Sequence, residues 1–179
     1  MNLPNKLTTM RVLLIPVVVV LLLVFEGTWA DIAAGVVYLI AAVTDLFDGK
    51  IARKYNLVTN FGKFMDPLAD KLLVCSTLIC MVAIGRAPAW AVIIIMAREF
   101  AISGFRLVAA GRGVVIAADW SGKIKTTLQN CWCIGMLFPI EWSVWKVLTT
   151  VAMVLAVILT VYSFIDYLLG NKNVLKDDV

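Results

Sequence analysis

The chain has 179 residues, of which 62% are hydrophobic, with a mean hydropathy of +0.95 and a formal net charge of +4. Soluble domains are about 45–50% apolar, so this composition excludes an ordinary water-soluble domain and indicates a polytopic membrane protein. The basic charge is not accompanied by a nucleic-acid recognition motif, and we expect no nucleic-acid partner.

Six apolar segments follow one another along the chain, each suited in length to a membrane-spanning helix. We therefore expect an all-α fold, a bundle of six transmembrane helices in a single domain (residues 1–179) with a polar tail at 170–179. The spans are predicted at about 8–25, 30–49, 67–85, 88–110, 123–140 and 143–169.

Basic residues fall mainly on one side of this predicted bundle. The opposite side carries only Arg86 and Lys146. Cytoplasmic loops carry an excess of Lys and Arg, so both termini and two longer basic loops, about 50–64 and 111–125, are predicted to face the cytoplasm from the inner membrane. The twelve residues on this side are Lys6, Arg11, Lys50, Arg53, Lys54, Lys63, Lys71, Arg112, Lys123, Lys125, Lys172 and Lys176.

Four aspartates occur at the predicted cytoplasmic ends of the second and third spans. Asp45 and Asp48 are three residues apart, and Asp66 and Asp70 are four apart. On a helix both spacings place side chains on one face. Because the two spans are antiparallel neighbours joined by one loop, we expect the four carboxylates to converge.

Four carboxylates at one place repel one another unless a cation compensates them. Hard oxygen donors suit Mg²⁺ or Mn²⁺, and two such ions clamp the entering and leaving oxygens of a phosphoryl displacement. We therefore predict two divalent cations. The alternative is structural: acids are common at helix ends, and Asp66 before Pro67 would serve as an N-cap.

Small residues lie between the aspartates, at Gly49, Ala52 and Gly62. They would let a flat ring or a phosphate approach the backbone, although close helix packing explains them equally well. Arg53, two turns after Asp45, would meet a phosphate or one of the acids.

The fourth predicted span contains two arginines, Arg98 and Arg106, and Glu99 lies beside the first. Charged residues inside a span are costly and commonly functional. With Lys123 or Lys125 opposite, the arginines would hold a second phosphate. Structural pairing, for example of Arg98 with one of the aspartates, is the alternative.

The residues from Asp45 to Asp70 spell D-x2-D-G-x2-A-R-x8-G-x3-D-x3-D, which resembles the signature of the CDP-alcohol phosphotransferase family at every fixed position. The resemblance implies a membrane-bound, homodimeric enzyme of six helices that transfers a phosphatidyl or similar group from a CDP-linked lipid to an alcohol. It implies metal ligation by Asp45, Asp48, Asp66 and Asp70, with Asp70 also the general base. It further implies a CDP-lipid pocket formed by Asp48, Gly49, Ala52, Arg53 and Gly62.

Two other stretches, "NLPNKLTTMR" at the start and "REFAISGFR" in the fourth span, resemble the branch of this family that uses CDP-diacylglycerol and sn-glycerol 3-phosphate. Inositol phosphate or serine is the alternative acceptor. A divalent-cation transporter is the alternative of another class, but transport sites lie near the midplane of the bilayer, whereas these acids lie at the ends of spans.

Overall fold

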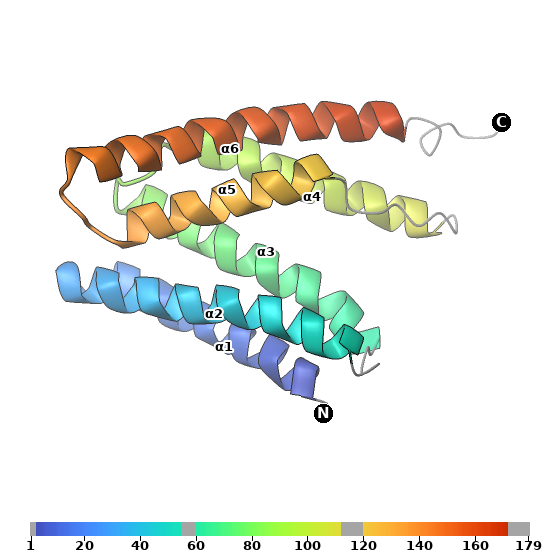
Figure 1. The fold of residues 1–179 in the computed structure, drawn as a ribbon, viewed down its shortest axis with the longest axis horizontal. Helices are drawn as coiled ribbons and strands as arrows, with labels where there is room; N and C mark the ends of the chain where they lie inside the picture. Colours follow the sequence, from blue (N-terminus) through green and yellow to red (C-terminus); the bar gives the residue numbers. More distant parts are fainter. Residues whose placement is uncertain (1–2, 55–59, 112–119, 172–179) are drawn as a thin grey trace. The chain divides into compact units, whose positions relative to one another are not determined.

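Six α-helices make up the computed structural model of the chain (Figure 1). The structure describes the backbone of residues 3–54, 60–111 and 120–171, and the side chains of residues 5–44, 65–111 and 120–171. These described ranges contain helices and turns but no strand, which confirms the all-α prediction. The helices are α1 (Leu3–Leu23), α2 (Thr28–Lys54), α3 (Asn60–Ala83), α4 (Ala89–Gly111), α5 (Trp120–Leu137) and α6 (Ser143–Gly170).

Several helices are longer than the apolar segments from which they were predicted, because they continue into polar sequence. α2 continues to Lys54 and α3 begins at Asn60, so the prediction of a long loop at 50–64 is wrong. The prediction of a loop at 111–125 is wrong at its end, since α5 begins at Trp120. Lys, Arg and Ala are strong helix formers, and a helix ends where its hydrogen bonding ends rather than where hydropathy falls.

The chain forms two compact units, of which the first comprises Met1–Ala87 and Cys133–Trp142. In this unit α1 packs against α2 and α3, and α2 packs against α3. α1 contributes larger apolar side chains to the core, and α2 contributes the Tyr38 ring and three alanines, whose small size allows close helix approach. The buried hydrophobic residues are Ile15, Val18 and Leu22 on α1, and Ala30, Ala34, Tyr38 and Ala41 on α2.

The end of α3 is fixed by a glycine and an ion pair. Gly85 has a φ of 73°, and the amides of Gly85 and Arg86 donate to the carbonyls of Val82 and Met81, respectively. This is the Schellman arrangement that commonly ends a helix. The Arg86 guanidinium then donates to Asp31 in the first turn of α2, with Nη2 2.7 Å from Oδ2. The ion pair thus ties α3 to α2 at this end of the unit.

The second unit comprises Pro88–Trp132 and Ser143–Val179. α4 packs against α6 in this unit. The Phe105 ring meets the Tyr167 ring edge-on, with the centroids 5.4 Å apart, and Ile102 completes the buried cluster. Aromatic pairs of this geometry add stability beyond the area that they bury.

The surface of the helices is strongly apolar. Within the described residues, two helical segments are long and apolar enough to cross a membrane, Asn5–Leu23 and Ser143–Gly170, and Thr28–Thr44 is a shorter apolar segment. On α6, side chains such as Leu148 and Ile158 are more than half exposed. Large apolar surfaces that face outward suit a lipid environment, so the fold is consistent with a helical membrane protein.

Candidate active site

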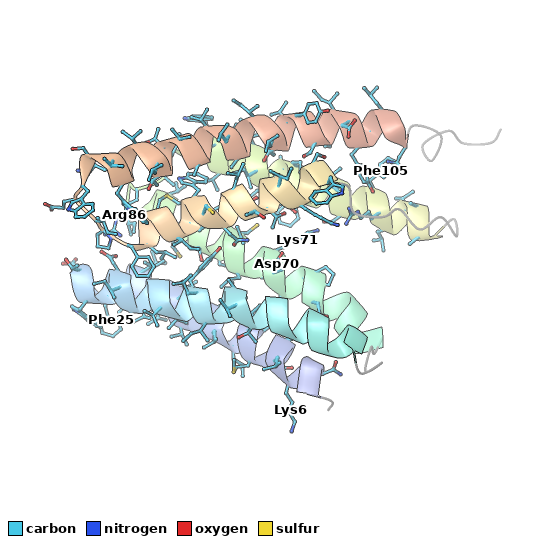
Figure 2. The ribbon with its side chains drawn as sticks, in the orientation of Figure 1. Lys6, Phe25, Asp70, Lys71, Arg86 and Phe105 are labelled. Atoms are coloured by element: carbon cyan, nitrogen blue, oxygen red, sulfur yellow. The ribbon has the colours of Figure 1, made fainter. Side chains whose placement is uncertain are left out.

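The four predicted aspartate positions lie near one junction of the first unit. Asp45 and Asp48 fall within the last ten residues of α2, and Asp66 and Asp70 fall within the first eleven of α3. The end of α2, the beginning of α3 and the N-terminus of α1 lie at the same end of this unit (Figure 1). Lys6 marks that end, and Phe25 and Arg86 mark the other (Figure 2).

The carboxylate of Asp66 is half-buried and accepts a hydrogen bond from another helix. Thr8 on α1, which is 1% exposed, donates its hydroxyl to Asp66, with Oγ1 2.5 Å from Oδ1. Asp66 lies inside α3 and Pro67 follows it within the helix, so the alternative explanation of Asp66 as an N-cap is wrong.

Asp70 lies one turn further along α3 and is also half-buried (Figure 2). Residues four apart on a helix share a face, and two carboxylates on one face supply the hard oxygen donors that suit Mg²⁺ or Mn²⁺. α2, which carries the other two aspartates, packs against α3. The donor set on α3 therefore fits a divalent cation.

Several predicted site residues lie outside the described side chains. These side chains belong to Asp45, Asp48, Gly49, Ala52, Arg53 and Gly62. Among the side chains that the structure does describe, no group of three or more His, Cys, Asp or Glu residues could hold a metal. Asp66 and Asp70 are the two members of the predicted metal site whose surroundings are defined.

Sequence reasoning assigned no site role to the polar residues of α1. Asn5, Thr8 and Arg11 are all buried, and Arg11 donates from Nε to the carbonyl of Ala41 on α2 at 3.3 Å. Their burial could have been predicted from the sequence, because positions 5, 8 and 11 lie at helical spacing on the same face as the buried residues Ile15, Val18 and Leu22. Burial of a polar side chain costs free energy unless the side chain is hydrogen-bonded, so polar residues in a core-facing stripe indicate specific hydrogen bonds to another helix.

The second unit contains a buried charged cluster formed by Arg98, Glu99 and Lys125. The Glu99 carboxylate accepts a hydrogen bond from the Lys125 ammonium group, and Arg98 Nη1 lies 3.4 Å from the same Oε1. Lys125 is 1% exposed and Glu99 is 8% exposed. The structure thus brings two basic side chains to one carboxylate oxygen in a largely buried place.

Arg106 and Lys123, the other two basic residues predicted to bind phosphate, lie against aromatic side chains. Arg106 donates from Nε to the hydroxyl of Tyr167 at 3.3 Å. The Lys123 ammonium group lies 5.3 Å from the centroid of the Trp120 ring and is exposed. Within the second unit the structure therefore brings Arg98 and Lys125 to one carboxylate and places Arg106 and Lys123 beside other partners.

Outward-facing apolar helices, two half-buried carboxylates one turn apart on α3 and buried basic side chains in the second unit are features expected of a helical, membrane-type enzyme of phosphate-group transfer. The chain belongs to the CDP-alcohol phosphatidyltransferase family, whose sequence profile matches residues 1–162. The family resemblance drawn from the spacing between Asp45 and Asp70 is thereby confirmed, and the chain is an enzyme of this type.

Curated relatives are similar over nearly the whole chain. A Bacillus subtilis protein named CDP-diacylglycerol–glycerol-3-phosphate 3-phosphatidyltransferase is 44% identical over 98% of this chain and 97% of its own length. A protein of the same name from Shigella flexneri is 35% identical over 98% of each chain. A probable phosphatidylglycerophosphate synthase of Mycobacterium tuberculosis is 38% identical over 93% of this chain and 79% of its own.

Proposed function

We propose that the chain transfers a phosphatidyl group from CDP-diacylglycerol to sn-glycerol 3-phosphate, which gives phosphatidylglycerol phosphate and CMP. The observation that carries this proposal is the 44% identity over 98% of the chain to a relative named for that reaction. Each unit taken by itself is compatible with this chemistry. Aspartates at the α2–α3 junction of the first unit suit the divalent cations of phosphoryl transfer, and the buried basic side chains of the second unit suit a phosphate.

In the proposed reaction a hydroxyl of glycerol 3-phosphate attacks the phosphorus that bears the diacylglycerol group. The new P–O bond forms as the bond to CMP breaks, and CMP leaves with the electron pair. Asp70 is proposed to accept the proton of the attacking hydroxyl, since a hydroxyl is a weak nucleophile until a base takes its proton. Its half-buried carboxylate on α3 suits this task.

The aspartates are also proposed to hold two divalent cations, Mg²⁺ or Mn²⁺. Asp66 and Asp70 would provide oxygen ligands from α3, and Asp45 and Asp48 would provide them from α2. When bound, such ions neutralise the pyrophosphate and stabilise the leaving group. The donor lipid is proposed to occupy a pocket formed by Asp48, Gly49, Ala52, Arg53 and Gly62.

The acceptor phosphate is proposed to bind the basic residues of α4 and α5. Lys125 and Arg98 are the best supported, because they lie together at the buried Glu99 carboxylate on two neighbouring parts of the same unit. Gln129, one turn after Lys125, is 3% exposed and would add a polar contact. Arg106 and Lys123 remain candidates that would have to leave Tyr167 and Trp120 to reach the phosphate.

We further propose six membrane spans with both termini and the aspartates at the cytoplasmic face of the inner membrane. Trp29, Trp90 and Trp142 support this topology, since all are more than half exposed and lie at or just before the N-terminal ends of α2, α4 and α6. Exposed tryptophans mark the interface between membrane and water. A homodimer among membrane lipids is proposed from the family signature.

The proposed function is tested by CMP release from the purified protein in detergent with CDP-diacylglycerol, Mg²⁺ and one acceptor at a time. Release that requires glycerol 3-phosphate and stops with EDTA is the expected result. Release with inositol phosphate or serine instead would overturn the acceptor assignment alone. No release with any alcohol, combined with metal flux into vesicles that Asp66→Asn abolishes, would favour a transporter.

A further inference from the structure

Thr8 joins the first helix to the predicted metal site. Its hydroxyl lies 2.5 Å from Oδ1 of Asp66, and 58 residues separate the two along the chain. The Thr8 side chain is 1% exposed, so water does not replace Asp66 as its partner without a rearrangement of the helices. Asp66 is therefore held by a group that belongs to neither of the two helices that carry the aspartates.

The rest of α1 holds Thr8 in place. α1 packs against both α2 and α3, and Arg11, one turn after Thr8, is fully buried with Nε 3.3 Å from the carbonyl of Ala41 on α2. The apolar stripe of Ile15, Val18 and Leu22 continues the same face. These contacts fix α1 on two sides, so the Thr8 hydroxyl is presented to Asp66 from a rigid element.

We propose that Thr8 is a positioning residue for the cation site: it engages Oδ1 of Asp66, limits rotation of the carboxylate and leaves Oδ2 for a divalent cation. Outer partners of this kind orient metal ligands and commonly change metal affinity about 10–100-fold when they are removed. A threonine suits this role because it is neutral. A Lys or Arg at the same place would offset the negative charge that attracts the cation.

This inference rests on the assignment of Asp66 as a metal ligand in the proposed function. The competing explanation is that the hydrogen bond only ties α1 to α3. The two explanations differ in one measurable quantity, since a structural tie changes stability without changing metal affinity in the protein that remains folded. Metal binding must therefore be measured separately from turnover.

Three variants of the full chain provide the test. Thr8→Val keeps the shape and removes the donor, whereas Thr8→Ser keeps the donor. Thr9→Val is the matched control, because the Thr9 hydroxyl donates to the carbonyl of Asn5 in its own helix at 2.9 Å. Mn²⁺ binding to each purified protein in detergent, without substrate, is followed by the electron paramagnetic resonance of free Mn²⁺.

We expect Thr8→Val to weaken Mn²⁺ binding about tenfold or more, and Thr8→Ser and Thr9→Val to stay within about twofold of the parent. The Mg²⁺ concentration for half-maximal CMP release should rise in parallel. In an Asp66→Asn background, Thr8→Val should have no further effect on Mn²⁺ affinity. Unchanged affinity in folded Thr8→Val would overturn the proposal.

If Thr8→Val cannot be isolated in a folded form, Thr8→Ala is measured in its place. A lower Mn²⁺ affinity for Thr8→Ala than for Thr8→Ser would support the proposal, and equal affinities would overturn it. A parent protein that binds no Mn²⁺ also overturns the inference. A parent that binds Mn²⁺ but releases no CMP with any acceptor contradicts the proposed function instead, and the Mn²⁺ affinities of the Thr8 variants still decide the role of this residue.

Discussion

The Lys125 ammonium group on α5 donates a hydrogen bond to the Glu99 carboxylate on α4, and both side chains are buried. Arg98 lies against the same carboxylate oxygen. One acid is therefore shared by two basic side chains. This arrangement holds two basic groups beside one carboxylate on α4 and α5, where phosphate is proposed to bind.

Lys125→Met should raise the KM for glycerol 3-phosphate at least tenfold while the KM for CDP-diacylglycerol changes little. A charge-assisted contact to phosphate is lost, and each factor of ten corresponds to about 1.4 kcal/mol. Lys123→Met should have a much smaller effect, because Lys123 is exposed beside Trp120. Steady-state kinetics with each substrate varied in turn measures both values. If Lys123→Met raises the KM for glycerol 3-phosphate more than Lys125→Met does, Lys123 and not Lys125 contacts the phosphate.

Asp70→Asn should lower kcat by about two to four orders of magnitude, the usual contribution of general acid–base catalysis. The amide is similar in shape to the carboxylate but does not accept the proton of the attacking hydroxyl. Binding of CDP-diacylglycerol, measured directly on the purified variant, should largely survive. If binding falls in proportion to turnover, Asp70 acts mainly as a metal ligand.

The helices and the positions of the aspartates were predictable because they follow from local patterns. Apolar runs marked all six helices, and the helical spacing of Asp66 and Asp70 was correctly inferred from residues four apart. The end of α2 and the beginning of α3 were not predicted. Hydropathy falls at the charged residues after Asp48, although those residues are good helix formers and the helix continues through them.

Contacts between distant residues were the part that the sequence did not reveal. Thr8 and Asp66 are 58 positions apart, and Glu99 and Lys125 are 26 apart. Their pairing depends on which faces of two helices meet, which local periodicity does not determine. A threonine in an apolar helix also does not by itself indicate a contact with another helix. Its hydroxyl commonly donates to a carbonyl one turn earlier in the same helix, as that of Thr77 does to Leu73.

Gly35→Ala should destabilise the first unit. A Cβ at Gly35 would lie 2.8 Å from the tip of the Phe138 ring, closer than packed carbon atoms approach, so the ring or the helix must shift. Overpacking of this kind costs about 1–3 kcal/mol. Gly104→Ala is the control, because no neighbouring atom lies within 4 Å of its added Cβ. Thermal unfolding in detergent should show a lower Tm for Gly35→Ala but not for Gly104→Ala. Adding Phe138→Leu to the Gly35→Ala variant should restore part of the lost Tm.

The proposed topology predicts opposite accessibility for the two ends of α1. Lys6 and Glu26 are both exposed; Lys6 is the second residue of the apolar segment Asn5–Leu23, and Glu26 follows its other end. In a background without the four natural cysteines, Glu26→Cys should react with a membrane-impermeant maleimide in intact cells, whereas Lys6→Cys should react only after permeabilisation. The positive-inside rule gives this expectation, because the basic residues gather at the Lys6 end. The reverse labelling would place the aspartates on the outer face, where a cytoplasmic acceptor has no access to them.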